Sequence, residues 1–208
     1  MAVHGFRREL GGRILLRCDE VERGMLLDLV GQLAEFVAPD EEWAEDADPL
    51  ARLVGIDQHA ERPDDPALVR LFPDAYADDD EAASEFRRFT ERSLRETKLA
   101  HARTVADSLT MSGDKLVLSD HDAQSWLGTL NDLRLTLGSR LGVEEDNHED
   151  FLELPEDHPY VTLYHVYDWL TFLQETLVRA LSGFEAELRE PRFPDGPGDQ
   201  PGEDDQPG

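Results

Sequence analysis

Hydrophobic residues recur at helical spacing along much of this chain, and the clearest run lies between residues 123 and 141. Its apolar positions are separated by three or four residues: Trp126, Leu130, Leu133, Leu137 and Leu141. On a helical wheel they share one narrow stripe, which is typical of a helix that packs one face on a core. Ser119 suits the N-cap position before this run, and Gly142 suits its end. We therefore expect residues 119–141 to form the central helix.

The same periodicity predicts helices on both sides of this segment. Asp19 and Glu22 have the spacing of a capping box, before a patterned stretch that reaches about Val37. A long helix is expected at 81–109, with five apolar anchors: Phe86, Phe89, Leu94, Val105 and Leu109. The last helix is expected at 159–183, and short helices at 49–56 and 65–71.

Two short runs near the start, residues 3–10 and 13–17, flank Gly11-Gly12 and predict a small N-terminal β-hairpin. A further strand candidate lies at 115–118. The predicted fold class is mainly α: a helical bundle of three long and two or three short helices with this hairpin. Residues 1–187 are expected to form a single helical domain.

Two acidic stretches lack a hydrophobic pattern. Residues 143–157 contain eight acidic residues and no Lys or Arg, which predicts a solvated loop. Residues 188–208 are acidic and rich in Pro and Gly, with few apolar groups to offset the entropy of ordering. We expect them to form a disordered acidic C-terminal tail.

The charge of the chain restricts its partners. Asp and Glu number 47 against 20 Lys and Arg, a formal net charge of -27. Such a chain is repelled by DNA and by anionic membranes, so unaided DNA binding and membrane association are not expected. No apolar run reaches the length of a membrane span, and the N-terminus lacks a signal-peptide pattern. The expected location is the cytoplasm.

Two polar residues interrupt the apolar stripes of the two best helices. Arg134 lies at the edge of the central stripe, and Gln174 lies in the middle of the last one. If these helices pack together, the two side chains form a buried polar network with Asn131 at its edge. A structural network is favoured because buried polar groups generally satisfy one another. The alternative is a ligand pocket lined by Arg134.

Two further features are candidates for function. Cys18 is the only cysteine and precedes a helix start, where a thiol can become reactive, although a core residue is the favoured alternative. Residues 85–103 include six basic and three acidic residues, which gives this stretch a charge of +3. Within this stretch Arg88, Arg92 and Arg95 form a candidate partner surface. Balancing the protein's own acidic loops is the favoured alternative, given the net charge.

Motifs of catalysis are missing from the chain. We find no phosphate-binding glycine loop, nucleophile elbow, paired cysteines or HExxH sequence. The histidines and acidic clusters lack metal-ligand spacing. The expectation is a non-enzymatic protein with no catalytic residues, cofactor or metal site.

Three segments resemble a known family. RLFPDAYADDDEAASEFRRFTERSLRETK (70–98), SWLGTLNDLRLTLGSRLGV (125–143) and YDWLTFLQETLVRAL (167–181) occur in the order found in the actinobacterial oxidative stress regulator (AosR) family, formerly a domain of unknown function. The resemblance implies a cytoplasmic, mainly helical regulator of transcription under oxidative stress, with a sigma factor or RNA polymerase as partner. Redox sensing proposed for such proteins uses two close cysteines. This chain has only Cys18, so no intramolecular thiol switch is carried over.

The resulting hypothesis is a regulator of the oxidative-stress transcriptional response that acts through protein–protein contacts. The family's usual gene neighbours suggest an alternative, an accessory or adaptor factor for Clp proteolysis or for cysteine and sulfur metabolism. A small-molecule binder or enzyme using the region of Arg134 is the third alternative. A homodimer is left open.

Overall fold

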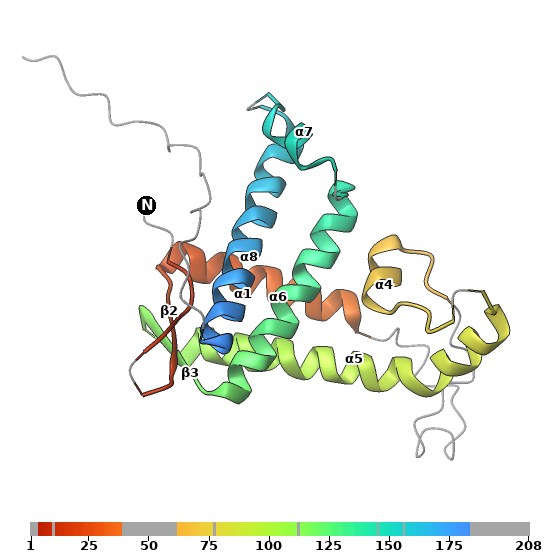
Figure 1. Cartoon of the computed structure of the whole chain (residues 1–208), viewed down its shortest axis with the longest axis horizontal. Helices are drawn as coiled ribbons and strands as arrows, with labels where there is room; N and C mark the ends of the chain where they lie inside the picture. Colours follow the sequence, from red (N-terminus) through yellow and green to blue (C-terminus); the bar gives the residue numbers. More distant parts are fainter. Residues whose placement is uncertain are drawn as a thin grey trace, which may run out of the picture.

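The computed structural model of the chain describes residues 4–9, 11–38, 62–76, 78–111, 113–144, 146–155 and 157–183. These residues form a mainly helical fold with a small sheet, which confirms the predicted fold class (Figure 1). The helices are α1 (Glu20–Val37), α4 (Pro66–Leu71), α5 (Asp80–Met111), α6 (Asp120–Leu141), α7 (His148–Leu152) and α8 (Pro159–Ser182). The strands are β1 (Arg7–Arg8), β2 (Ile14–Arg17) and β3 (Lys115–Leu118).

Some sequence-based predictions lie outside the described residues. They are the short helix at 49–56, the domain end at 187 and the acidic tail at 188–208, and all three stay predictions. None of the helices in the described ranges combines the length and apolarity that crossing a bilayer requires.

Helix ends follow the capping signals in the sequence. The Glu22 amide donates to the Asp19 carboxylate at 2.8 Å, and the Asp19 amide donates to the Glu22 carboxylate at 2.8 Å. Ser119 and Asp122 form the same reciprocal pair at the start of α6. Gly142 ends that helix with φ of 70°, a left-handed conformation that glycine adopts at low cost.

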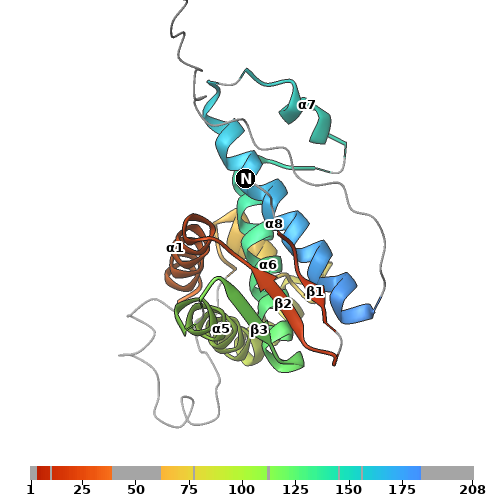
Figure 2. The same cartoon turned by 90° about the vertical axis from the view of Figure 1, so that its left-hand side faces the viewer.

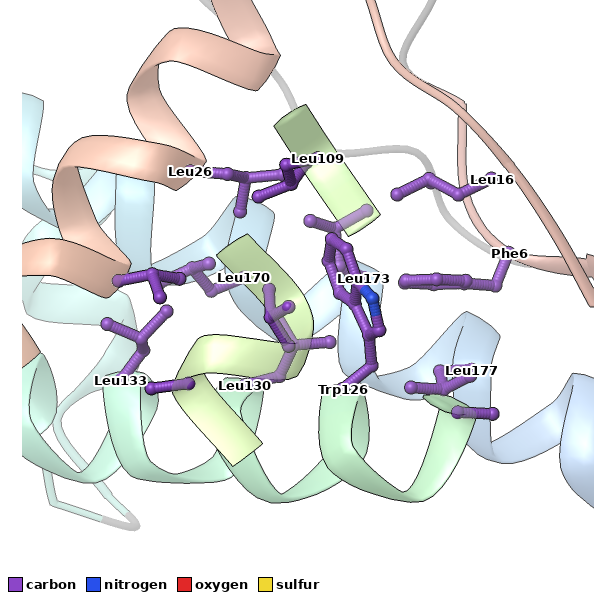
Figure 3. Packing of buried hydrophobic residues seen from close by; sticks show 14 of the residues in the cluster. Phe6, Leu16, Leu26, Leu109, Trp126, Leu130, Leu133, Leu170, Leu173 and Leu177 are labelled. Carbon is purple, nitrogen blue, oxygen red and sulfur yellow. The ribbon is translucent and has the colours of Figure 1, made fainter. Parts of the chain in front are cut away.

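Helix α6 is the centre of the fold, since it packs against α8, α5, α4 and α1. Helices α6 and α8 run side by side, with α7 at the far end, and α5 crosses beneath them (Figures 1 and 2). The core between them contains the fully buried Trp126, whose ring lies edge-on to Phe6 at 5.4 Å between centroids (Figure 3). Leu130 and Leu133 continue this buried stripe of α6, facing the leucines of α8.

The sheet has three antiparallel strands in the order β1-β2-β3. Strand β3 therefore extends the predicted hairpin, with Leu16 paired to Leu116. The N-terminal segment also lies against the last helix: the Phe6 amide donates to Thr176 Oγ1 at 3.0 Å, and Arg8 Nε donates to the Ala180 carbonyl at 2.8 Å. At Gly5 a Cβ atom would come within 2.4 Å of Thr176, so only glycine permits this approach.

Two local predictions are wrong. Residues 148–152 form the short helix α7 inside the stretch predicted as a loop. On α5, Phe86, Phe89 and Leu94 are not core anchors, since 44, 52 and 42 % of their surfaces are exposed. Charged residues, Arg87, Glu91 and Arg95, occupy the buried positions of that half of the helix.

Removing the central aromatic ring should destabilise the whole fold. We expect Trp126→Ala to lower the free energy of unfolding by about 3–5 kcal/mol, because the fully buried side chain leaves a cavity. Urea unfolding followed by far-UV circular dichroism measures the change. The matched control is Val178→Ala on α8, where 46 % of the side chain is exposed and the effect should stay within about 0.5 kcal/mol. Equal effects would contradict the central place of Trp126.

Candidate functional site

Three charged residues lie on the buried side of α5 and form what we call the buried ion cluster: Arg87, Glu91 and Arg95. Their exposed fractions are 5, 2 and 7 %. Their i,i+4 spacing places them on one face of the helix, one turn apart. Arg87 Nη1 donates to Glu91 Oε2 at 3.1 Å, and Arg95 Nη2 donates to Glu91 Oε1 at 2.6 Å. One carboxylate thus holds two guanidinium groups inside the protein.

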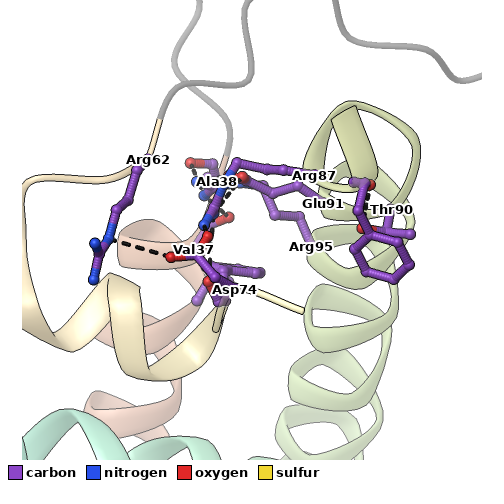
Figure 4. Close-up of polar contacts among 10 residues, drawn as sticks. Val37, Ala38, Arg62, Asp74, Arg87, Thr90, Glu91 and Arg95 are labelled. Atoms are coloured by element: carbon purple, nitrogen blue, oxygen red, sulfur yellow. Dashed lines mark hydrogen bonds and ion pairs between the residues drawn. The ribbon is translucent and has the colours of Figure 1, made fainter. Parts of the chain in front are cut away.

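The ion cluster connects three segments of the chain (Figure 4). Arg95 Nη1 donates to the Val37 carbonyl at 2.9 Å, which satisfies an otherwise unpaired carbonyl at the end of α1. Arg87 bonds to the Asp74 carboxylate and to the Phe72 carbonyl, both just after α4. The guanidinium of Arg95 also lies 4.5 Å from the centre of the Phe72 ring. These contacts fix the position of α5 against α1 and the 72–74 segment.

A second buried pair extends this charged stripe to the central helix. Lys98 Nζ donates to Asp132 Oδ1 at 2.7 Å, and only 5 % of the Asp132 side chain is exposed. Burial raises the pKa of Asp132, while the hydrogen bond and the charge of Lys98 act in the opposite direction. The pair joins α5 to α6, so α5 is held to two neighbouring helices by buried charges.

Because charges face inward, the apolar side chains of this half of α5 face solvent. We name Tyr76, Phe86, Phe89 and Leu94 the α5 apolar surface. Between 42 and 52 % of each of these residues is exposed. Tyr76 and Phe86 lie edge to face at 6.2 Å between ring centroids, so the surface is partly ordered by its own contacts. Large exposed apolar side chains grouped in this way are typical of a binding surface.

Hydroxyl groups between these side chains are already used inside the helix. Thr90, Ser93 and Thr97 donate to main-chain carbonyls of Phe86, Thr90 and Ser93, at 2.9, 2.8 and 2.8 Å. If a partner covers these hydroxyls, each one keeps its hydrogen bond to a carbonyl of α5. Covering this part of α5 therefore carries a small polar desolvation penalty.

The α5 apolar surface borders a shallow hollow between α5 and the 72–75 segment. Its lining includes the apolar Phe86 and Leu94 and the buried Arg87 and Glu91. Since Arg87 and Glu91 line this hollow, it lies directly beside the ion cluster.

The predicted partner surface needs a correction. Arg95 is buried in the ion cluster, where its guanidinium bonds to Glu91 and to the end of α1, so it does not lie on an exposed face. Arg92 is exposed and bonds to Glu96 at 3.1 Å, and Arg88 is half-buried. Arg88 and Arg92 thus lie beside the α5 apolar surface, together with the exposed Glu85 and Glu96.

Arg87 and Glu91 were not predicted as inward-facing residues. Their signal in the sequence is the spacing Arg87, Glu91, Arg95, in which opposite charges alternate at every fourth position along one side of the helix. Oppositely charged residues with this same spacing also occur on exposed helices, so the spacing alone does not indicate that these three residues are buried. The three neighbouring aromatic and leucine side chains gave a misleading apolar signal.

Arg134 and Gln174 meet between α6 and α8, but both are half-buried and not buried as the sequence predicts. Arg134 Nη1 donates to Gln174 Oε1 at 2.5 Å, and Arg134 Nε donates to Thr171 Oγ1 at 2.9 Å. The guanidinium also lies 5.5 Å from the centre of the Tyr167 ring. Asn131 is exposed and bonds to Asp132 instead of joining Arg134 and Gln174, so its predicted place at the edge of that network is wrong. With its donors directed to α8, Arg134 fits the structural interpretation.

Cys18 is a core residue. Only 4 % of its surface is exposed. Burial raises the pKa of its thiol to about 12, and the carboxylate of Glu22 acts in the same direction. A thiol in this position is protonated at neutral pH and is a poor nucleophile, so the favoured alternative of a core residue fits better than a redox thiol. Within the described ranges, no three His, Cys, Asp or Glu side chains are placed to share a metal ion.

Fold and surface together define a class: an acidic, mainly helical protein with an exposed apolar face on its longest helix. The chain belongs to the family described as a domain of unknown function, DUF2017, whose model matches residues 3–181. Relatives named oxidative stress regulator AosR, from Mycobacterium bovis and Mycobacterium tuberculosis, are 38% identical over 176 residues. That alignment covers 78% of this chain and 79% of each relative. These names support a regulatory role in oxidative stress. No solved structure matches the chain.

Removing the carboxylate of the ion cluster should be far more damaging than removing an exposed one. We expect Glu91→Gln to lower the free energy of unfolding by about 3–5 kcal/mol, because Arg87 and Arg95 then lack their shared counter-charge in a buried site. Urea unfolding measures the effect. Glu96→Gln is the matched control, since it removes an exposed pair with Arg92 and should cost less than about 1 kcal/mol. Similar losses in both variants would contradict the role of burial.

Thiol reactivity tests the state of Cys18. Compared with an ordinary thiol, a pKa of about 12 reduces the thiolate fraction near neutral pH about 10³-fold. We expect very slow reaction of the native protein with Ellman's reagent and fast reaction in guanidinium chloride, where the thiol is exposed. The unfolded chain is its own control. A native rate close to the unfolded rate would show that the thiol is accessible and ionised.

Proposed function

We propose that this protein regulates transcription under oxidative stress through contacts with a protein partner, without enzymatic activity of its own. The observation that carries the proposal is the α5 apolar surface, held in place by the buried ion cluster and bordered by Arg88 and Arg92. Large apolar side chains exposed together on a rigid helix are suited to a protein interface, in which a few aromatic anchors supply most of the affinity. The names of the relatives, oxidative stress regulators, support the biological setting of the proposal.

A sigma factor or RNA polymerase is the proposed partner, in line with the family resemblance. The net charge of -27 opposes direct contact with DNA, because phosphate binding requires a basic footprint. A partner that itself binds promoters removes this difficulty. The protein then acts on transcription while its own acidic surfaces stay away from the duplex.

The oxidant signal is proposed to enter by a route other than the Cys18 thiol. A sensing cysteine requires a thiolate that oxidants can reach. Cys18 is buried, and its pKa is raised to about 12. Oxidation of the partner, or a change in the amount of this protein, could carry the oxidant signal without a reactive thiol in this chain.

A genetic experiment in the native organism tests the function. We expect a deletion strain to lose part of its oxidant-dependent transcription and to survive peroxide or a thiol oxidant poorly. The gene for the wild-type protein should restore both, and so should Cys18→Ser, because the thiol is buried in the core. RNA sequencing before and after oxidant measures the response.

Two outcomes would overturn the proposal. An unchanged transcriptional response in the deletion strain would remove the regulatory role. Tight binding of the purified protein alone to promoter DNA at physiological salt, in a gel-shift assay, would replace the partner-mediated mechanism by direct DNA binding.

A further inference from the structure

We propose that the acidic segment after α8, residues 184–208, docks on the outer face of the sheet and shields that face from other anions. Four exposed cations mark this face, and we call them the basic sheet face: Arg7 on β1, Arg13 just before β2, Arg17 at the end of β2, and Lys115 on β3.

Alternation along the strands places these cations on one side of the sheet. Leu16 and Leu116 pair with each other and point into the main core. Arg17 and Lys115, the neighbouring pair, therefore point outward. The other two cations lie on the same side, because they align with β2 positions two and four residues before Arg17. Four residues along β2 and two strand spacings across the sheet give the patch a size of about 14 by 10 Å.

The charges of this face are not neutralised inside the fold. Among the described residues, no carboxylate forms an ion pair with any of the four cations. Glu9 shares the face, opposite Arg13, which leaves a charge of +3. Arg17 and Lys115 are direct cross-strand partners, and like charges in such positions repel each other. A carboxylate bound between these two side chains offsets that repulsion.

The 184–208 segment has the complementary charge. It contains eight acidic and two basic residues, a net charge of -6. Its last part, residues 193–208, contains five acidic residues and no Lys or Arg. Pairing of carboxylates with guanidinium and ammonium groups requires no fixed conformation of the segment, so the contact agrees with the lack of order predicted from its composition.

The end of α8 brings this segment to the sheet. Arg8 Nε donates to the carbonyl of Ala180, in the last turn of α8, so the helix ends beside β1 (Figure 2). From β1 the far strand β3 is two strand spacings away, about 10 Å. The acidic residues between 195 and 205 follow Gly183 by 12 to 22 residues. A flexible chain of that length has an end-to-end distance of about 20–25 Å, which is enough to reach all four cations.

The chain's own segment is a better occupant than a second copy or a nucleic acid. Tethering gives the segment an effective concentration of order millimolar at the sheet. A second copy and a nucleic acid each bring a large negative charge toward a chain of net charge -27. The docked segment then competes with any other acidic chain for the basic sheet face.

Carbodiimide cross-linking of the full chain tests the contact. The reagent activates a carboxylate, and a lysine amine then forms an amide with it while a urea leaves. Lys115 suits the assay because Lys98, the other lysine of the chain, is 17 % exposed and bonded to Asp132. We expect mass spectrometry to find Lys115 joined to acidic residues between 195 and 205 of the same chain. In 1 M NaCl, where the Debye length is about 3 Å, this product should fall about tenfold.

The acidic stretch around α7 is the internal control. Residues 143–157 also contain eight acidic residues, but α7 lies at the end of the molecule away from the sheet (Figure 1). They should not be joined to Lys115. No product with the 184–208 segment, an equal yield with residues 143–157, or a yield that salt leaves unchanged would overturn the inference. Cross-linked dimers in place of products within one chain would also overturn it, because the occupant would then be a second copy.

An anionic probe measures the shielding. The probe is a fluorescent peptide of about ten glutamates, and its binding to the full chain is followed by anisotropy at low salt. A variant with five amides in the segment should bind the probe about tenfold more tightly, because the tethered competitor is weakened. Its substitutions are Asp195→Asn, Asp199→Asn, Glu203→Gln, Asp204→Asn and Asp205→Asn. Adding Arg17→Gln and Lys115→Gln to this variant should abolish the gain.

A variant with the same change of charge elsewhere is the matched control. It carries Glu144→Gln, Asp146→Asn, Glu149→Gln, Asp150→Asn and Glu153→Gln, all at exposed positions. We expect less than about a twofold change in probe affinity, because these residues lie away from the sheet and their field is screened over that distance. Equal gains in the two variants, or no gain in the first, would contradict shielding by the 184–208 segment.

Discussion

Two guanidinium groups that share one buried carboxylate determine how the longest helix sits in this protein. Arg87 and Arg95 lose their hydration when α5 packs, and the loss is offset only if Glu91, Asp74 and the main-chain carbonyls of the neighbouring segments are all in place. The positions of α1, α5 and the segment after α4 therefore depend on one another. Helix α1 must end where Arg95 can reach its last carbonyls, and the chain after α4 must place Asp74 beside Arg87. A hydrophobic contact would tolerate sliding, but these hydrogen bonds do not.

This arrangement has a consequence for the outside of α5. Since the inner positions are taken by charged side chains, the aromatic rings that precede and follow them in sequence lie on the outer side, with hydroxyl groups between them. Most helices of soluble proteins have the opposite distribution. The reversed distribution gives an acidic protein one exposed apolar face that is rigidly held. An interface built on such a face needs little rearrangement of the protein before binding.

Local signals in the sequence were sufficient for most of the helices and their ends. Asp19, Ser119 and Gly142 act through contacts a few residues away, so their roles are visible without the fold. The meeting of Arg134 and Gln174 was also predictable, because each interrupts an otherwise regular stripe. The orientation of α5 was not, since paired charges spaced by four residues look the same whether they are exposed or buried. The strand at 115–118 was a candidate, but its pairing with β2 spans about a hundred residues, beyond the reach of any local pattern.

The contact between β1 and α8 joins the two ends of the described chain. The Phe6 amide bonds to Thr176, 170 residues later, and Phe6 also covers the ring of Trp126. During synthesis the first strand leaves the ribosome long before its partner helix exists. Until α8 is made, Phe6 and the buried residues of β2 have no complete core to enter. Closing such a large loop is slow compared with forming helices, so this contact can form only after nearly all of the described chain has been made.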